Sequence, residues 1–300
     1  MRSTFARACA VTLVVAAVTA GCSDRPAPAE TPAPSRAGRP DVTDSDRTLL
    51  RHTEQVLVQR CMAAKGFSYW VGPRPTPDES FTVGYLLSDV TWARKHGYGS
   101  RIGRKVLGAR TTNPNLRYVD GLTPERRTAY RGALEGGTDA RTLSVRVPGG
   151  GTITRRLGGC EETAQAELYG DPATWFRVSK TATNLTPLYV AKLSRDPEFT
   201  RAQAAWSACM RGAGHPYANP EDARAAIPAP AGDLSEAKAF AAEVRLATAE
   251  AECAGSSGFA RTGRALERRY VDGLRGEYGA ELDAYARLER EALDRARSLT

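Results

Sequence analysis

The chain has 300 residues, and its 42 lysines and arginines against 34 aspartates and glutamates give a formal net charge of +8. Most of the basic residues are arginine in a chain rich in alanine, as GC-rich genomes encode, so the positive charge does not indicate nucleic acid as a partner. The charge does favour contact with anionic lipid or an anionic wall polymer, within a Debye length of about 8–10 Å.

The N-terminus predicts an export signal. Arg2 and Arg7 precede an apolar run over residues 8–18, which is far shorter than the roughly 20 residues of a membrane-spanning helix. The run ends at Thr19-Ala20-Gly21-Cys22, and small residues before a cysteine resemble the lipobox of bacterial lipoproteins, although Thr19 stands where Leu or Val is more usual. The resemblance implies that residues 1–21 are removed and that lipid on Cys22 anchors the chain to the bilayer. The alternative is a secreted protein without lipid.

A proline-rich segment follows the cysteine. Five prolines lie between residues 22 and 41 among Ala, Ser, Thr and charged residues, a composition that buries no core. Residues 22–45 are therefore predicted to form a disordered tether. Together with the lipid, such a tether holds a folded domain at the outer face of the cytoplasmic membrane.

The segment 46–195 is predicted to be a first helical half that contains one β-hairpin. Apolar residues recur at helical spacing over 46–65, and Thr123-Pro124-Glu125 is typical of a helix start. We expect a short helix over 89–95, an irregular loop over 96–116, a helix from 123 to before Gly136, hairpin strands over 142–147 and 152–157, a helix from Cys160 to Gly170, and a helix from Asp171 that breaks near Thr186-Pro187.

The segment 196–300 is predicted to be a second helical half. Asp196-Pro197 and Asn219-Pro220 are typical of helix starts, and residues 235–254 are strongly helical. Residues 261–299 keep three- and four-residue apolar steps, which predicts one long helix. The fold class is therefore mainly α with one β-hairpin.

Two segments of the chain match each other. Cys61-Met62-x-x-x-Gly66-x-x-Tyr69 recurs as Cys209-Met210-x-x-x-Gly214-x-x-Tyr217, and Arg117-Tyr-Val-Asp-Gly-Leu122 recurs unchanged at 269–274. The separation between the two motifs is nearly the same in both copies, which indicates an old tandem duplication. The alternative is coincidence in a chain of biased composition.

The four cysteines beyond Cys22 predict two disulfides, because an even number in an exported chain favours pairing. Four cysteines allow three pairings, and we favour Cys61–Cys160 with Cys209–Cys253 because each pair closes within its own half. The cysteines have no C-x-x-C spacing, and the three histidines lie far apart and join no cysteine at ligand spacing. No metal site is therefore predicted.

Several motifs in residues 46–300 are similar to those of uncharacterised actinobacterial secreted lipoproteins. They are Cys61-Met62…Gly66-Phe67-x-Tyr69, His96-Gly97-Tyr98-Gly99, the hairpin before Gly159-Cys160, and Trp206-Ser207-Ala208-Cys209-Met210. The resemblance implies structural roles for these residues and no known activity, so it supplies no catalytic residue.

The stretch from 91 to 119 has seven basic residues and no acid. His96, Tyr98, Arg101 and Arg104 are candidate contacts to a phosphate, a carboxylate or an anionic wall polymer, because arginines bind such groups through forked hydrogen bonds. The alternative is a solvated loop. A charge run by itself says little about a binding site.

His215 and Tyr217, with two acidic residues close behind them, form the densest polar cluster. His215 and Tyr217 are candidate contacts of a small polar pocket, and the alternative is that this segment caps the next helix. No serine lies in a G-x-S-x-G setting, and the glycines at 149–151 join two strands and not a strand and a helix, so no catalytic residue and no cofactor is predicted.

These observations favour a membrane-anchored lipoprotein of the cell envelope that binds a ligand, an envelope protein or a wall polymer without catalysing a reaction. The alternative is an envelope hydrolase whose acid–base residues are dispersed in the sequence. A cleft that brings His215 or His96 within hydrogen-bond reach of a carboxylate would favour the hydrolase.

Overall fold

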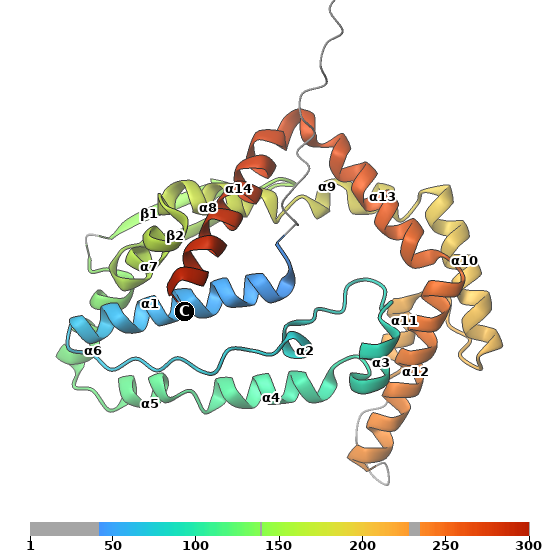
Figure 1. Ribbon diagram of the computed structural model, residues 1–300, viewed down its shortest axis with the longest axis horizontal. Coiled ribbons are helices and arrows are strands. Elements are labelled where there is room, and N and C mark those ends of the chain that lie inside the picture. Colours follow the sequence, from blue (N-terminus) through green and yellow to red (C-terminus); the bar gives the residue numbers. More distant parts are fainter. Residues whose placement is uncertain (1–41, 139, 228–234, 300) are drawn as a thin grey trace, which may run out of the picture. The chain divides into compact units, whose positions relative to one another are not determined.

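Helices joined by short connections make up most of the described chain, which comprises residues 42–138, 140–227 and 235–299 of a computed structural model (Figure 1). The elements up to the hairpin are α1 (Asp44–Ala64), α2 (Pro77–Ser80), α3 (Val90–His96), α4 (Ser100–Thr111), α5 (Pro114–Asp120), α6 (Pro124–Glu135), β1 (Arg141–Arg146) and β2 (Thr152–Leu157). Those after it are α7 (Gly159–Tyr169), α8 (Pro172–Ala182), α9 (Thr186–Leu193), α10 (Pro197–Gly212), α11 (Pro220–Ala225), α12 (Glu236–Ser256), α13 (Phe259–Gly273) and α14 (Arg275–Leu299).

The predicted fold class, mainly α with one hairpin, is therefore confirmed. The signal peptide, Cys22 and all but the last few residues of the predicted tether lie outside the described residues. Among the described helices, none combines the length and the apolar character that crossing a membrane requires.

Polar caps start the helices where the sequence predicts them. The side chains of Thr123, Asp171, Asp196 and Asn219 accept hydrogen bonds from backbone N–H groups of the first turn, and each precedes a proline. Helix α1 begins two residues earlier than predicted, because Thr43 and Asp46 form a reciprocal capping box.

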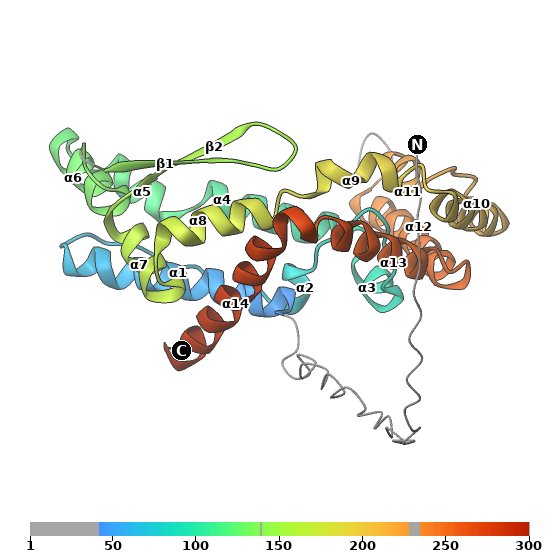
Figure 2. The same ribbon diagram turned by 90° about the horizontal axis from the view of Figure 1, so that it is seen from above.

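The hairpin and both disulfides confirm the predictions made for them. Strands β1 and β2 pair antiparallel, with Arg146 opposite Thr152, and the turn between them contains three glycines at positive φ (Figure 2). The disulfides are Cys61–Cys160 and Cys209–Cys253, with Cα atoms 5.5 and 5.6 Å apart. Loops closed over separations of 99 and 44 residues constrain the unfolded chain by about 4–5 kcal/mol each in the entropy model.

The first hydrophobic core lies between α1, α6, α7 and the last helix, α14. Its buried residues are Val42, Leu50, Leu57, Val58, Met62, Phe67, Tyr130, Cys160, Ala164, Leu168, Tyr169, Ala292, Leu293 and Ala296. Ala292, Leu293 and Ala296 come from α14, so the C-terminal helix completes a core that is otherwise built from the first part of the chain.

A second core surrounds α10, α12 and α13. It contains Phe199, Trp206, Met210, Ala223, Leu246, Cys253, Ala254, Phe259, Ala260 and Leu266. Beside it, Leu87 and two residues of α3, Trp92 and Ala93, pack on Ala247 and Ala251 of α12. A segment from the N-terminal half thus packs on a helix of the C-terminal half. The reverse holds for α14, a C-terminal helix that packs into the core of the N-terminal half.

The prediction of an irregular loop over 96–116 is wrong, because α4 and α5 occupy most of it. The sequence offers α4 no side-chain cap, since its N-cap residue is Gly99. The cap comes instead from Glu243 of α12, whose carboxylate accepts from the backbone N–H groups of Tyr98 and Ser100 at 2.8 and 3.1 Å. A helix start that a distant residue supplies is invisible to local patterns.

The prediction of one helix over 261–299 is also wrong. The helix breaks at Leu274, directly after Gly273, into α13 and α14. Helix α13 places Leu266 in the second core, whereas α14 places Leu293 in the first, and one straight helix does not serve both. Arg275 bridges the break by pairing with Asp272 and Asp283 at 3.4 and 3.2 Å.

The matching Cys-Met segments end their helices in the same way. Gly66 and Gly214 both have positive φ, 76° and 83°. The backbone N–H that follows each glycine donates to the carbonyl of the motif methionine, Phe67 to Met62 and His215 to Met210. The residue two positions before each cysteine also acts alike, since Gln59 donates to the Tyr69 carbonyl and Ser207 to the Tyr217 carbonyl, both at 2.7 Å. The partner cysteines differ: Cys160 begins α7, whereas Cys253 lies near the end of α12.

Replacing Glu54 by glutamine is expected to stabilise the protein at neutral pH. Burial against α7 raises the pKa of Glu54 above its ordinary 4.5, although its carboxylate accepts a hydrogen bond from Gln165 at 2.9 Å. The native state favours the protonated form, so stability from this group is present at low pH and lost as the pH rises through the raised pKa. Urea unfolding should show Glu54→Gln more stable than wild type by roughly 1 kcal/mol at pH 7.

The difference should shrink as the pH falls from the raised pKa towards 4.5, because the native wild-type carboxyl takes up its proton over this range. Glu167→Gln, on the exposed side of α7, serves as the matched control and should change little. A Glu54→Gln protein that is less stable than wild type at pH 7 would contradict this account.

Candidate functional site

Two glutamates of α12 are buried and fully hydrogen-bonded. Glu250 has no exposed surface and accepts hydrogen bonds from the backbone N–H of Leu87 at 2.8 Å, from Arg224 at 3.2 Å and from the hydroxyl of Tyr98. Glu243, two turns earlier, caps α4. Buried carboxylates are tolerated only with such partners, so the two residues fix the segment from Leu87 to Ser100 on α12.

The same network sets the position of residues 84–88. Arg224 donates to the backbone carbonyl of Tyr85 at 2.7 Å as well as to Glu250. At the far end of this segment, Arg264 of α13 donates to the Ser88 hydroxyl at 3.4 Å. The segment is thereby held at Tyr85 and at Ser88, and the Tyr85 side chain is half-exposed.

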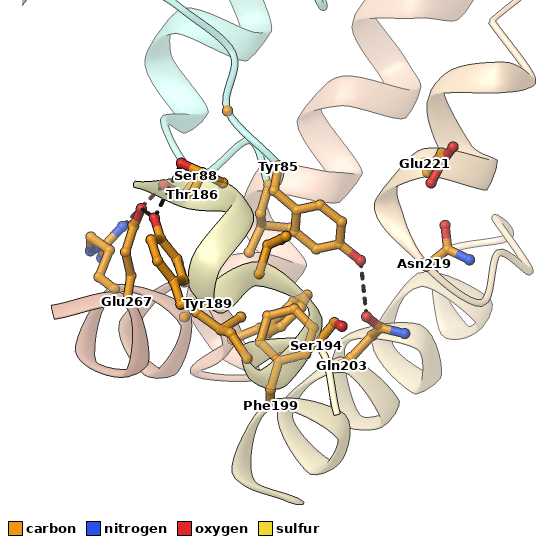
Figure 3. Close-up of a pocket in the computed structure, with 18 residues that line it drawn as sticks. Tyr85, Ser88, Thr186, Tyr189, Ser194, Phe199, Gln203, Asn219, Glu221 and Glu267 are labelled. Atoms are coloured by element: carbon orange, nitrogen blue, oxygen red, sulfur yellow. Dashed lines mark hydrogen bonds between the residues drawn. The ribbon is translucent and has the colours of Figure 1, made fainter. Parts of the chain in front are cut away.

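A cleft of about 690 Å³ lies between this segment and α9, α10, α11 and α13 (Figure 3). Its volume falls within the range of about 300–1,000 Å³ that is usual for small-molecule sites. It is lined by Gly84, Tyr85, Leu86, Ser88, Thr186, Tyr189, Val190, Leu193, Ser194, Phe199, Gln203, Asn219, Glu221, Phe259, Ala260, Gly263, Arg264 and Glu267.

Three aromatic rings are among the residues that line the apolar part of the cleft. Phe199 and Phe259 are buried with ring centroids 5.1 Å apart, and the ring of Tyr85 lies 5.8 Å from that of Phe199. Leu193 and the exposed side chain of Val190 extend this surface along α9. Such a surface binds apolar groups by removing them from water.

The polar groups of the cleft lie around this apolar surface. The Tyr85 hydroxyl donates to Gln203 at 3.0 Å, and the Tyr189 hydroxyl donates to Glu267 at 3.0 Å (Figure 3). Burial raises the pKa of both tyrosines, and the charge of Glu221 adds to the effect on Tyr85. Both hydroxyls therefore stay protonated at neutral pH and act as hydrogen-bond donors.

The cleft presents hydroxyl, amide, carboxylate and guanidinium groups beside its apolar surface. Its described lining contains no histidine and no cysteine, and its acidic and basic side chains form no nucleophile–base pair. Over the part of the chain that the structure describes, no group of histidine, cysteine, aspartate or glutamate side chains is arranged to hold a metal ion.

His96 and Tyr98 lie outside the cleft. The Nε2 atom of His96 is 2.9 Å from the carboxylate of Asp78, which Lys95 also contacts at 2.5 Å. Hydrogen bonds from Lys95 and His96 lower the pKa of Asp78. Tyr98 packs on the second core and donates to Glu250, and burial raises its pKa well above the ordinary range. The His96 contact joins the end of α3 to α2, and the Tyr98 contact joins the segment before α4 to α12.

Arg101 and Arg104 face the start of α12. Both contact Glu236, at 3.7 and 2.8 Å, and the guanidinium of Arg101 lies 3.7 Å from the ring centroid of Phe240. Neither arginine is among the residues that line the cleft beside Tyr85.

His215 and Tyr217 belong to the ending of α10. The backbone N–H of His215 and the carbonyl of Tyr217 are both hydrogen-bonded within this ending, and neither residue lines the cleft. Two residues a little further along the same segment, Asn219 and Glu221, do line it. The polar segment singled out in the sequence thus borders the cleft, but its lining side chains are those of Asn219 and Glu221 and not those of His215 and Tyr217.

Sequence reasoning missed most of the lining residues, among them Tyr85, Tyr189 and Gln203. They come from four separate elements and share no spacing or motif. The only local signal is Tyr85 itself, a large aromatic residue in a connecting segment that carries no helix or strand pattern.

Comparisons with protein-family models, with curated proteins and with solved structures find no match to this chain.

Replacing Glu250 by alanine is expected to destabilise the protein by about 3–5 kcal/mol, because it leaves the Arg224 charge and the Leu87 N–H without their buried acceptor. Urea unfolding measures the loss. Glu250→Gln keeps one acceptor oxygen and should lose less than the alanine variant. A loss below about 1 kcal/mol in Glu250→Ala would show that the network does not hold the segment.

Proposed function

We propose that this protein is a binding protein of the cell envelope, held to the membrane by lipid on Cys22, and that it takes a small, largely apolar ligand into the cleft beside Tyr85. The observation that carries the binding role is the cleft itself. A volume of about 690 Å³ with an aromatic surface and a few polar groups around it is the usual form of a ligand site.

The envelope location rests on the sequence and is supported by the disulfides. Residues 1–22 have the order of a lipoprotein signal, as in the uncharacterised secreted lipoproteins that the chain resembles. Disulfides persist in oxidising compartments, and Cys61–Cys160 and Cys209–Cys253 both tie core helices together.

The hydrolase alternative has less support. His96 does lie within hydrogen-bond reach of a carboxylate, that of Asp78, but this pair is outside the cleft and shares its acid with Lys95. His215 contacts no carboxylate side chain among the described residues. A substrate in the cleft would thus meet neither histidine.

Filling the cleft is expected to abolish ligand binding without unfolding the protein. Gly263 lines the cleft from within α13, and a Cβ built on it meets no atom within 4 Å. Leucine at this position projects into open space and favours the helix over glycine by about 0.8–1 kcal/mol. We expect the neutral apolar dye N-phenyl-1-naphthylamine to bind wild type with one dye per chain and to lose at least tenfold in affinity in Gly263→Leu, as measured by its fluorescence.

Gly103→Leu is the matched control, since Gly103 is exposed within α4, has equally open space around its Cβ and lies away from the cleft. It should bind the dye as wild type does. Equal binding in wild type and in Gly263→Leu would overturn the proposed site, and absence of binding in both would overturn the binding role.

Lipid attachment is expected to depend on Cys22 alone. Cells that express the full chain and are fed a labelled fatty acid should incorporate label into wild type, with a mature N-terminus at residue 22 by mass spectrometry. Cys22→Ala should carry no label. On phase separation of a detergent extract of the cells, it should enter the aqueous phase and not the detergent phase, because the lipid anchor is then absent. Label that persists in Cys22→Ala, or an unprocessed wild-type N-terminus, would contradict the proposed anchor.

A further inference from the structure

The charged groups of the cleft lie on two sides of its apolar surface. Figure 3 shows Glu221 and Asn219 on one side, and Ser88, Thr186 and Glu267 on the other, with Tyr85 between them. Arg264 belongs to the second side, because it donates to Ser88. The lining thus holds two carboxylates and one guanidinium, and the guanidinium shares its side with Glu267, three residues along α13.

Glu221 is the carboxylate whose hydrogen-bonding capacity is unused. It is exposed and makes no hydrogen bond or ion pair with any residue that the structure describes. The other acidic groups nearby have partners: Glu267 accepts from Tyr189 at 3.0 Å, and Asp222 accepts from Asn219 at 2.8 Å. A ligand group that reaches this side therefore meets one free negative charge.

The surroundings of Glu221 favour a positive charge on the ligand. Both Glu221 and the half-exposed ring of Tyr85 line the cleft, and the face of a tyrosine ring attracts a cation. The side-chain carbonyl of Gln203 accepts the hydrogen bond of the Tyr85 hydroxyl, and Gln203 adds a second polar group on the same side. A ligand carboxylate would lie against the Glu221 charge here, and on the far side it would meet Glu267 as well as Arg264.

We propose that the cleft selects amphiphiles with a cationic head, an apolar body lying on Phe199, Phe259 and Leu193 and a protonated amine paired with Glu221. This inference rests on the proposed binding function and names the class of ligand. The apolar body supplies most of the affinity, and the amine supplies the selectivity, because an ion pair at an open rim adds modestly to binding.

Three probes that share one chain and differ in the head group test the inference: octylamine, octanol and octanoate. Each is measured by displacement of N-phenyl-1-naphthylamine from the wild-type chain at low ionic strength. We expect octylamine to bind about three- to fivefold more tightly than octanol, and octanoate to bind more weakly than octanol. In Glu221→Gln the preference for the amine should fall below about twofold, while the affinity for octanol stays within a factor of two.

The control variants are Glu167→Gln, which lies away from the cleft, and Glu267→Gln, which removes the other carboxylate of the cleft. Glu167→Gln removes an exposed glutamate on α7 and should keep the full preference for the amine. If octanol and octylamine bind wild type equally, the cationic selectivity is wrong and the cleft remains a ligand site. If the preference survives in Glu221→Gln and disappears in Glu267→Gln, the assignment to Glu221 is wrong. If none of the probes displaces the dye, the binding function itself fails.

Discussion

The position of the cleft depends on two glutamates buried on one helix. A carboxylate that loses water must have hydrogen-bond donors around it, and Glu243 and Glu250 take theirs from the segment between Leu87 and Ser100. This requirement draws a part of the early chain onto α12. The segment that precedes it, with Tyr85, is thereby brought against α10 and α13, and the space left between them is the cleft. The cleft is thus a consequence of satisfying two buried carboxylates.

The cleft also depends on the exchange of elements between the two cores. Helix α14 packs into the first core, and Leu86 and Tyr98 of the early chain pack against the second, so neither core draws on one half of the chain alone. The disulfides lie within the cores, Cys61–Cys160 in the first and Cys209–Cys253 in the second, and each joins helices that already pack together. The bridges therefore constrain the unfolded chain, while the buried glutamates and apolar contacts decide which segments meet.

Local signals made most of the fold predictable, and contacts between distant residues account for what was missed. Helix starts such as Asp196-Pro197 and the hairpin follow from caps and alternation, which are properties of neighbouring residues. The disulfide pairing was predicted differently, by preferring pairs that close within one half of the chain. Helix α4 was missed because its cap is Glu243, well over a hundred residues away. The break at Leu274 was missed because apolar spacing continues across it, and only the need to fill two cores separates α13 from α14. The cleft was missed for the same reason, since its lining is assembled from residues that no spacing connects.

The two Cys-Met segments have the same helix ending but are followed by different structures. In both copies a positive-φ glycine ends the helix and a side chain holds the carbonyl of the motif tyrosine. After Tyr69 the chain continues extended as Trp70 and Val71, and the positions that correspond to Asn219 and Glu221 are Val71 and Pro73, which carry no charge. After Tyr217 the chain instead starts α11, and Glu221 lines the cleft. The helix ending is common to both copies, so it serves the fold, and the residues that follow it distinguish the copy that borders the cleft.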